Sequence, residues 1–192
     1  MKAFPSIKKG AWGNFFLGVF ILLLIIPQTG QPIQVAINRL KVMVWSPSVE
    51  KAETMEKVPA FTYVTQSLEG QGIAHFIGKD KVTFLSFWAT WCAPCVAELP
   101  SIAALHKDYK DQISFVLVSR ENPEVVKRFL DKKDLNLPVY FPSMEVPEVL
   151  QSNTLPTNYL IDGKGNIVIA EKGAADWNSK KVREVLEELL EE

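Results

Sequence analysis

The sequence predicts a three-layer α/β/α sandwich with a mixed central sheet, preceded by an N-terminal transmembrane helix. Three observations predict this fold class: an uncharged apolar run at residues 15–26, two near-continuous apolar runs at 82–88 and 113–119 with a helical pattern between them, and a turn signal at 162–165 between two short apolar runs. The chain has 192 residues, of which 47% are hydrophobic, so it is long enough for one domain with a hydrophobic core and a short extension.

The net charge of −1 hides two unlike parts of the chain. Residues 1–49 contain five basic side chains and no acidic one, whereas residues 50–192 contain 16 basic and 22 acidic side chains. This asymmetry predicts a short basic segment at a membrane and an acidic domain in water. It disfavours a nucleic-acid partner, because the larger part of the chain would repel phosphate.

Residues 11–27 are the predicted membrane segment. The uncharged stretch 11–26 gives roughly 24 Å of helix, which is short of the ~20 residues that cross a bilayer comfortably, so a cleaved signal peptide and a buried core helix are alternatives. No small-x-small cleavage site follows it, which favours an uncleaved signal anchor. Three lysines precede the span and only Arg39 and Lys41 follow it closely, so residues 1–10 are predicted to be a cytoplasmic basic segment and the remainder to lie outside.

Residues 28–59 are predicted to form a juxtamembrane helix and a linker. Four apolar residues recur there at helical spacing, namely Ile33, Ile37, Leu40 and Val44. This pattern fits a short helix on the membrane surface and equally an amphipathic helix packed on the domain. Residues 46–57, with mixed charge, are the predicted linker.

Residues 60–192 form the predicted globular domain, in which short strands and helices alternate. The apolar runs 82–88 and 113–119 are typical of strands buried on both faces of a sheet. Between them a helix is predicted from Cys92 to about Tyr109, so the three elements make a βαβ unit.

The later elements follow from local signals. Asn122 and Pro123 are typical of an N-cap and a first helical residue, and Val125 and Val126 are among the side chains expected to face inward. Strands are predicted at 139–141, 158–161 and 167–170, a short helix at 146–151, and a C-terminal helix from about residue 179.

The chain has two cysteines, Cys92 and Cys95, where the first buried strand meets the helix. A thiol at a helix N-terminus has a lowered pKa, because free N–H groups and the helix dipole favour the thiolate. Cys92 is therefore the predicted exposed nucleophile, and Cys95, one turn further, the shielded resolving thiol. A structural disulfide would stabilise little, since it closes a two-residue loop. A zinc site would need two further ligands, and His75 and His106 lack the required spacing. The favoured prediction is a redox dithiol without metal or cofactor.

Residues 87–100 read Phe-Trp-Ala-Thr-Trp-Cys-Ala-Pro-Cys-Val-Ala-Glu-Leu-Pro. This segment resembles the active-site signature of the TlpA/ResA-like branch of the thioredoxin superfamily, whose members are membrane-anchored thiol-disulfide oxidoreductases. The resemblance covers roughly residues 60–192 and includes Leu-Pro-Thr-Asn-Tyr-Leu-Ile-Asp at 155–162. It implies a thioredoxin-like fold for the domain.

The resemblance also implies roles for particular residues. Pro156 matches a proline that is cis in the family and lines the substrate groove, where Leu155 would pair with an extended substrate segment beside Trp91. The alternative is a trans proline opening an edge strand. Glu98 matches a glutamate implicated in proton transfer to the buried cysteine, and the alternative is a solvated helix carboxylate. Cytoplasmic thioredoxins have a buried aspartate where this chain has Ser86, so an assisting carboxylate would have to be Glu98.

The predicted function is an extracytoplasmic thiol-disulfide oxidoreductase that reduces oxidised disulfides in exported proteins and is itself reduced by a membrane thiol electron donor. The resemblance implies a single-pass protein of the cell inner membrane with its catalytic domain on the periplasmic side, and apocytochrome c as one candidate substrate. A disulfide oxidase or isomerase on the same fold is one alternative. A non-catalytic, membrane-tethered peptide-binding module is another.

Overall fold

The computed structural model describes residues 12, 14–19, 27–42, 44–49 and 56–191. Its strands are β1 (Phe61–Ser67), β2 (Gly72–Ile77), β3 (Thr83–Phe87), β4 (Ser114–Val118), β5 (Val139–Pro142), β6 (Thr157–Ile161) and β7 (Ile167–Lys172). Its labelled helices are α2 (Pro27–Val42), α3 (Ala93–Tyr109), α4 (Pro123–Lys133), the 3₁₀ helix η1 (Glu148–Leu150) and α5 (Lys180–Glu191).

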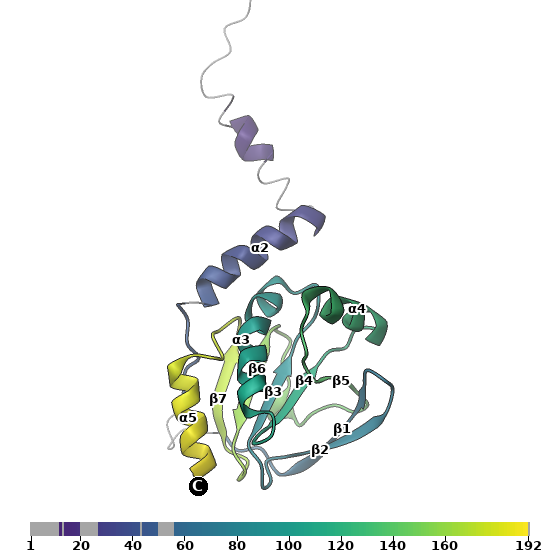
Figure 1. The fold of residues 1–192 in the computed structure, drawn as a ribbon, viewed down its shortest axis with the longest axis vertical. Coiled ribbons are helices and arrows are strands. Elements are labelled where there is room, and N and C mark those ends of the chain that lie inside the picture. Colours follow the sequence, from purple (N-terminus) through teal and green to yellow (C-terminus); the bar gives the residue numbers. More distant parts are fainter. Residues whose placement is uncertain (1–11, 13, 20–26, 43, 50–55, 192) are drawn as a thin grey trace, which may run out of the picture.

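Residues 61–172 contribute a seven-stranded sheet in the order β2-β1-β5-β4-β3-β6-β7 (Figure 1). The pairs β3/β4 and β4/β5 are parallel, whereas β1/β2, β1/β5, β3/β6 and β6/β7 are antiparallel. The predicted α/β fold with a mixed sheet is therefore confirmed. The strands β3 and β4 are central and almost wholly buried, as their apolar runs predict.

The hairpin β1/β2 extends the sheet at one edge. Its two strands were not predicted from the sequence. Outward side chains alternate with buried ones along β1, so its apolar pattern is weaker than that of a central strand. At the other edge, Gly165 closes the β6/β7 turn with a φ of 89°. A Cβ there would lie 2.4 Å from the carbonyl oxygen of Val58, so this turn requires glycine.

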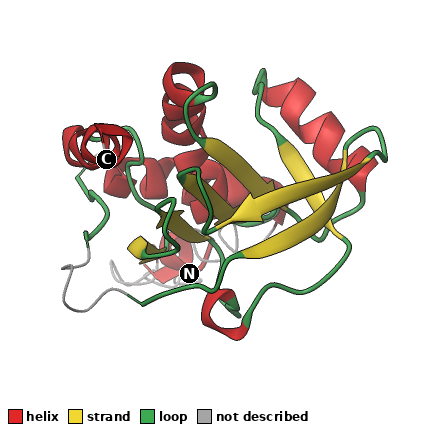
Figure 2. Ribbon diagram, turned by 90° about the horizontal axis from the view of Figure 1, so that it is seen from below, coloured by secondary structure: helices red, strands yellow, loops and turns green. Residues whose placement is uncertain are grey.

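The helices cover the two faces of the sheet unequally. Side chains of α3, α4 and α5 pack with Phe84 and Leu117 in one apolar core. On the opposite face, Leu85 and Val116 pack with Leu150 of η1. Figure 2 shows the longer helices on one side of the sheet and the short helix on the other. The predicted three layers are thus present in a reduced form, because the second helical layer of this domain is a 3₁₀ helix of three residues, which follows Pro147.

The predicted cap of α4 is confirmed. Asn122 Oδ1 accepts a hydrogen bond from the backbone N–H of Glu124 at 2.8 Å, and Pro123 begins the helix. Val126 is buried as expected, but Val125 is 38% exposed and does not face the core.

Upstream of the domain, α2 packs against α3 (Figure 1). Within residues 12, 14–19, 27–42, 44–49 and 56–191, no helix combines the length and apolar character that crossing a bilayer requires. The predicted span falls partly on residues 20–26, which lie outside the described residues. Two residues of the predicted linker form isolated antiparallel bridges: Val49 pairs with Ile169 of β7, and Lys57 with Asn166 just before β7.

Candidate active site

The two cysteines lie at the start of α3 and form a disulfide, with their Cα atoms 5.2 Å apart. Cys92 is the N-cap of the helix, and its Sγ accepts a hydrogen bond from the backbone N–H of Cys95 at 3.3 Å. In the reduced protein, the same N–H group and the helix dipole would favour a thiolate at Cys92. The structure therefore gives Cys92 the local environment of a nucleophile.

Burial differs from the prediction for one of the two thiols. Cys95 is fully buried, as expected of a shielded resolving thiol, but Cys92 is only 5% exposed. The prediction of an exposed Cys92 is wrong for this disulfide-bonded form, because a helix N-terminus sets the electrostatic environment of a thiol but not its accessibility. The neighbouring Trp91 is 66% exposed instead, so the surface beside the disulfide is an indole ring.

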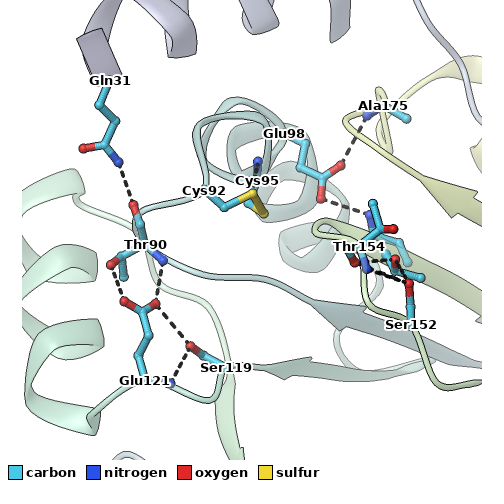
Figure 3. Close-up of a disulfide and its surroundings, with 12 residues drawn as sticks. Gln31, Thr90, Cys92, Cys95, Glu98, Ser119, Glu121, Ser152, Thr154 and Ala175 are labelled. Carbon is cyan, nitrogen blue, oxygen red and sulfur yellow. Dashed lines mark hydrogen bonds between the residues drawn. A yellow bond between two sulfur atoms is a disulfide. The ribbon is translucent and has the colours of Figure 1, made fainter. Parts of the chain in front are cut away.

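The loop ahead of the cysteines is held by a carboxylate from the next strand-helix connection. Glu121 accepts hydrogen bonds from the backbone N–H of Thr90 at 2.6 Å and from the Thr90 hydroxyl at 2.7 Å (Figure 3). Ser119 Oγ donates to the same carboxylate at 3.4 Å. Thr90 precedes Cys92 by two residues, so these bonds fix the backbone just ahead of Cys92.

Glu98 is the third residue after Cys95 and is fully buried beside the disulfide (Figure 3). Three groups donate to its carboxyl: Asn158 Nδ2 at 3.0 Å, the backbone N–H of Ala175 at 3.2 Å and Trp177 Nε1 at 3.3 Å. Burial raises the pKa of Glu98 from 4.5 to about 8, although the three hydrogen bonds act in the opposite direction. The alternative of a solvated helix carboxylate is therefore wrong.

The side-chain amide of Asn158 can form a hydrogen bond with Glu98 in either protonation state of the carboxyl. Its Nδ2 donates to Oε1 of Glu98, while its own buried Oδ1 has no hydrogen-bond partner within the described part of the chain. A protonated Oε1 would need an acceptor, and a half-turn of the Asn158 amide would present Oδ1 to it. Ser86 pairs with Asn158 in the β3/β6 register and is also fully buried, so the position of the thioredoxin aspartate adjoins this pair without supplying a carboxylate.

The Leu155–Pro156 peptide bond is cis, the isomer that the resemblance implies. Thr157 pairs with Phe87 across β6 and β3, so Pro156 lies at the same end of the sheet as the cysteine loop. A cavity of about 640 Å³ opens there and is lined by Trp91 and Leu155 among others. These two residues thus share one groove, while Pro156 itself is buried.

Several residues of the site were not predicted from the sequence. No local sequence pattern marks Glu121 or Asn158, because each forms its hydrogen bond with a residue at least 31 positions away. Trp177 meets Glu98 across 79 positions. Within the described residues no group of three or more histidine, cysteine, aspartate or glutamate side chains is arranged to hold a metal ion.

Comparisons with known proteins agree with this geometry. Residues 54–170 match the AhpC/TSA family. The thiol-disulfide oxidoreductase ResA of Bacillus thuringiensis is 33% identical over 144 residues, which are 73% of this chain and 79% of the relative. ResA of Oceanobacillus iheyensis is 34% identical over 132 residues, which are 67% of this chain but 64% of that relative, slightly less than two thirds of its length.

A solved structure is similar as well. The crystal structure of StoA from Bacillus subtilis superimposes with a TM-score of 0.51 at 27% identity, over 71% of this chain and all of that one. The family match and the ResA relatives agree with the Cys92–Cys95 disulfide at a helix N-terminus. The chain belongs to the thioredoxin-like AhpC/TSA family and is a thiol-disulfide oxidoreductase related to ResA.

Proposed function

We propose that this protein is a membrane-anchored reductant of disulfides in exported proteins, with Cys92 as nucleophile and Cys95 as resolving thiol. The observation that carries the proposal is the cysteine pair at the N-terminus of α3, with the buried carboxyl of Glu98 one turn further along the same helix. A helix N-terminus favours the attacking thiolate, and a buried acid supplies a site for the proton of the second thiol.

The reaction has two exchange steps. The Cys92 thiolate attacks one sulfur of a substrate disulfide, which forms a mixed disulfide and releases the other substrate sulfur as a thiolate. Cys95 then loses its proton and attacks Cys92 Sγ, which releases the second substrate sulfur and leaves the Cys92–Cys95 disulfide. The substrate gains two electrons and takes up two protons. A membrane dithiol donor returns the two electrons and two protons to the enzyme.

Glu98 is the proposed acceptor of the Cys95 proton. Its pKa of about 8 is close to that of an ordinary thiol, about 8.5. Near pH 8, where about half of the Glu98 carboxyls are ionised, a proton can therefore pass from Cys95 to Glu98 at little cost in free energy. Asn158 accompanies this transfer as a positioning residue, because its amide can donate to the carboxylate or accept from the acid.

The substrate is proposed to lie along Leu155 and Pro156 as an extended segment, with Trp91 covering one side of the 640 Å³ groove. Apocytochrome c is the proposed substrate by family analogy, since its haem-binding cysteines must be reduced. The extracytoplasmic location rests on the basic, acid-free residues 1–49 and the apolar run 15–26.

Two measurements test the proposal. Purified protein is expected to catalyse insulin reduction, and Cys92→Ser to abolish it, whereas a binding module would show no turnover. The reduction potential of the pair is expected near that of thioredoxin, about −270 mV, and a value near about −120 mV, typical of the strong oxidants of this fold, would show an oxidase instead.

A further inference from the structure

The helix α2 presents two different faces. Its inner face is fixed to the domain at both ends: Gln31 Nε2 donates to the carbonyl oxygen of Thr90 at 2.9 Å, and Val42 is buried with Ala97 of α3 and with Ala174. At about 100° per residue, Leu40 lies about 160° around the helix from Val42. The contacts of the inner face therefore determine which side of α2 is turned away from the domain.

This outer face is apolar and uncovered. Ile37 is 58% exposed, Leu40 68% and Val44, just beyond the helix, 88%. These three residues, defined here as the outer patch, point away from the domain and touch neither the sheet nor the helices of residues 56–191 in an apolar core. Burying a leucine-sized side chain is favourable, so an uncovered patch of this kind indicates a missing contact surface.

Charge and chain continuity indicate which surface covers it. The apolar run 15–26 ends directly before α2, and residues 1–49 contain no acidic side chain. Lys41 lies beside the outer patch on the helix, whereas the indole of Trp45 is turned to the domain, where its Nε1–H donates to Glu171 at 3.4 Å. An apolar stripe with a flanking lysine is typical of a helix at an anionic lipid interface. A second copy of the same basic segment would instead repel this one.

We propose that α2 lies flat on an anionic membrane surface with the outer patch among the lipids, and that it thereby holds the redox pair toward the membrane. The proposal rests on the membrane anchor of the proposed function. Gln31 binds Thr90, two residues before Cys92, on the side of α2 opposite the outer patch. The cysteine loop then lies about one helix diameter, roughly 10–12 Å, below the lipid. A suitable donor must present its dithiol at the bilayer surface rather than on a long soluble arm.

The test uses the full chain in nanodiscs of zwitterionic and anionic phospholipid. The protein is kept oxidised, so that its native cysteines do not react with a maleimide. A fluorophore is attached at Leu40→Cys in the outer patch or at Glu188→Cys, an exposed position of α5 near the end of the domain away from α2 (Figure 1). Lipids with a headgroup-level spin label are expected to quench the probe at Leu40→Cys and to leave the probe at Glu188→Cys unquenched.

A second readout follows the orientation of the redox pair. The variant Ile37→Glu/Leu40→Glu is expected to be reduced at least roughly tenfold more slowly by a dithiol attached to a lipid headgroup, because the burial of even one leucine-sized side chain is worth more than a factor of about ten. Its reduction by dithiothreitol should match that of the unaltered chain. Val125→Glu on α4, also an exposed apolar helix position, is the matched control and should change neither rate.

Three outcomes would overturn the proposal. If neither probe is quenched while the protein stays with the discs, the anchor holds but α2 does not lie on the lipid. If the Leu40→Cys probe is shielded only when cross-linked dimers form, the outer patch binds a second copy. If the protein does not stay with the discs at all, the membrane anchor of the proposed function fails, and the orientation of α2 fails with it.

Discussion

The buried carboxyl of Glu98 makes the stability of the fold depend on pH, and one substitution isolates its contribution. The pKa of Glu98 is raised from 4.5 to about 8 by burial. Between these values the unfolded chain has lost this proton while the folded chain keeps it. The contribution of Glu98 to stability is therefore most favourable below pH 4.5, falls as pH rises through the window from 4.5 to 8, and is constant above it.

The size of the effect follows from the pKa difference. One pKa unit corresponds to about 1.4 kcal/mol, so this carboxyl lowers the free energy of unfolding by roughly 3 kcal/mol between pH 4 and pH 7 and by about 5 kcal/mol once it is fully ionised. Glu98→Gln has no proton to lose in this range. A rotated Asn158 amide can accept from the new NH₂ group, while the new oxygen keeps the bonds from Ala175 and Trp177.

The assay compares the two oxidised proteins by urea unfolding from pH 5 to pH 8, followed by tryptophan fluorescence. We expect the difference in unfolding free energy between Glu98→Gln and the unaltered chain to change by about 2–3 kcal/mol between pH 5 and pH 7 in favour of the glutamine variant. Glu188→Gln, which alters an exposed glutamate of α5, should follow the unaltered chain at every pH. Parallel curves for Glu98→Gln and the unaltered chain would refute the burial argument.

Two further predictions concern the partners of the site. Asn158→Leu removes a donor that lowers the pKa of Glu98, so the Glu98 titration measured by carbon NMR should move upward, and an unmoved titration would show that the amide has no influence on the carboxyl. Glu121→Ala leaves the N–H and hydroxyl of Thr90 without their acceptor and should lower the free energy of unfolding by about 1–3 kcal/mol. An unchanged unfolding midpoint for Glu121→Ala would mean that Thr90 finds another partner.

Sequence reasoning was reliable where a local pattern decides the structure. The apolar runs of β3 and β4, the Asn122 cap and the cysteines at the start of α3 depend on neighbouring residues, and all appear as predicted. The hairpin β1/β2 was missed because one face of each strand is solvated and the apolar pattern is diluted. The second helical layer is smaller than predicted, because residues 146–151 contain only a single 3₁₀ turn.

The candidate site depends on contacts that local patterns do not contain. The sequence placed Glu98 one turn from Cys95, but its burial results from residues 60 to 79 positions further along the chain. In the same way, Glu121 reaches Thr90 only because β4 lies beside β3 in the sheet. The exposure of Cys92 was mispredicted because a helix N-terminus fixes the electrostatic environment of a thiol but not its accessibility.

The most direct test of the proposed function is to trap the mixed disulfide. A Cys95→Ser variant expressed in its host cannot complete the second exchange step, so substrates should accumulate as mixed disulfides with Cys92. Dithiothreitol should reduce these mixed disulfides and release the substrates. These adducts are expected to contain exported proteins and to be absent from Cys92→Ser/Cys95→Ser. The absence of adducts in Cys95→Ser, or adducts that persist in the double variant, would contradict the proposed function.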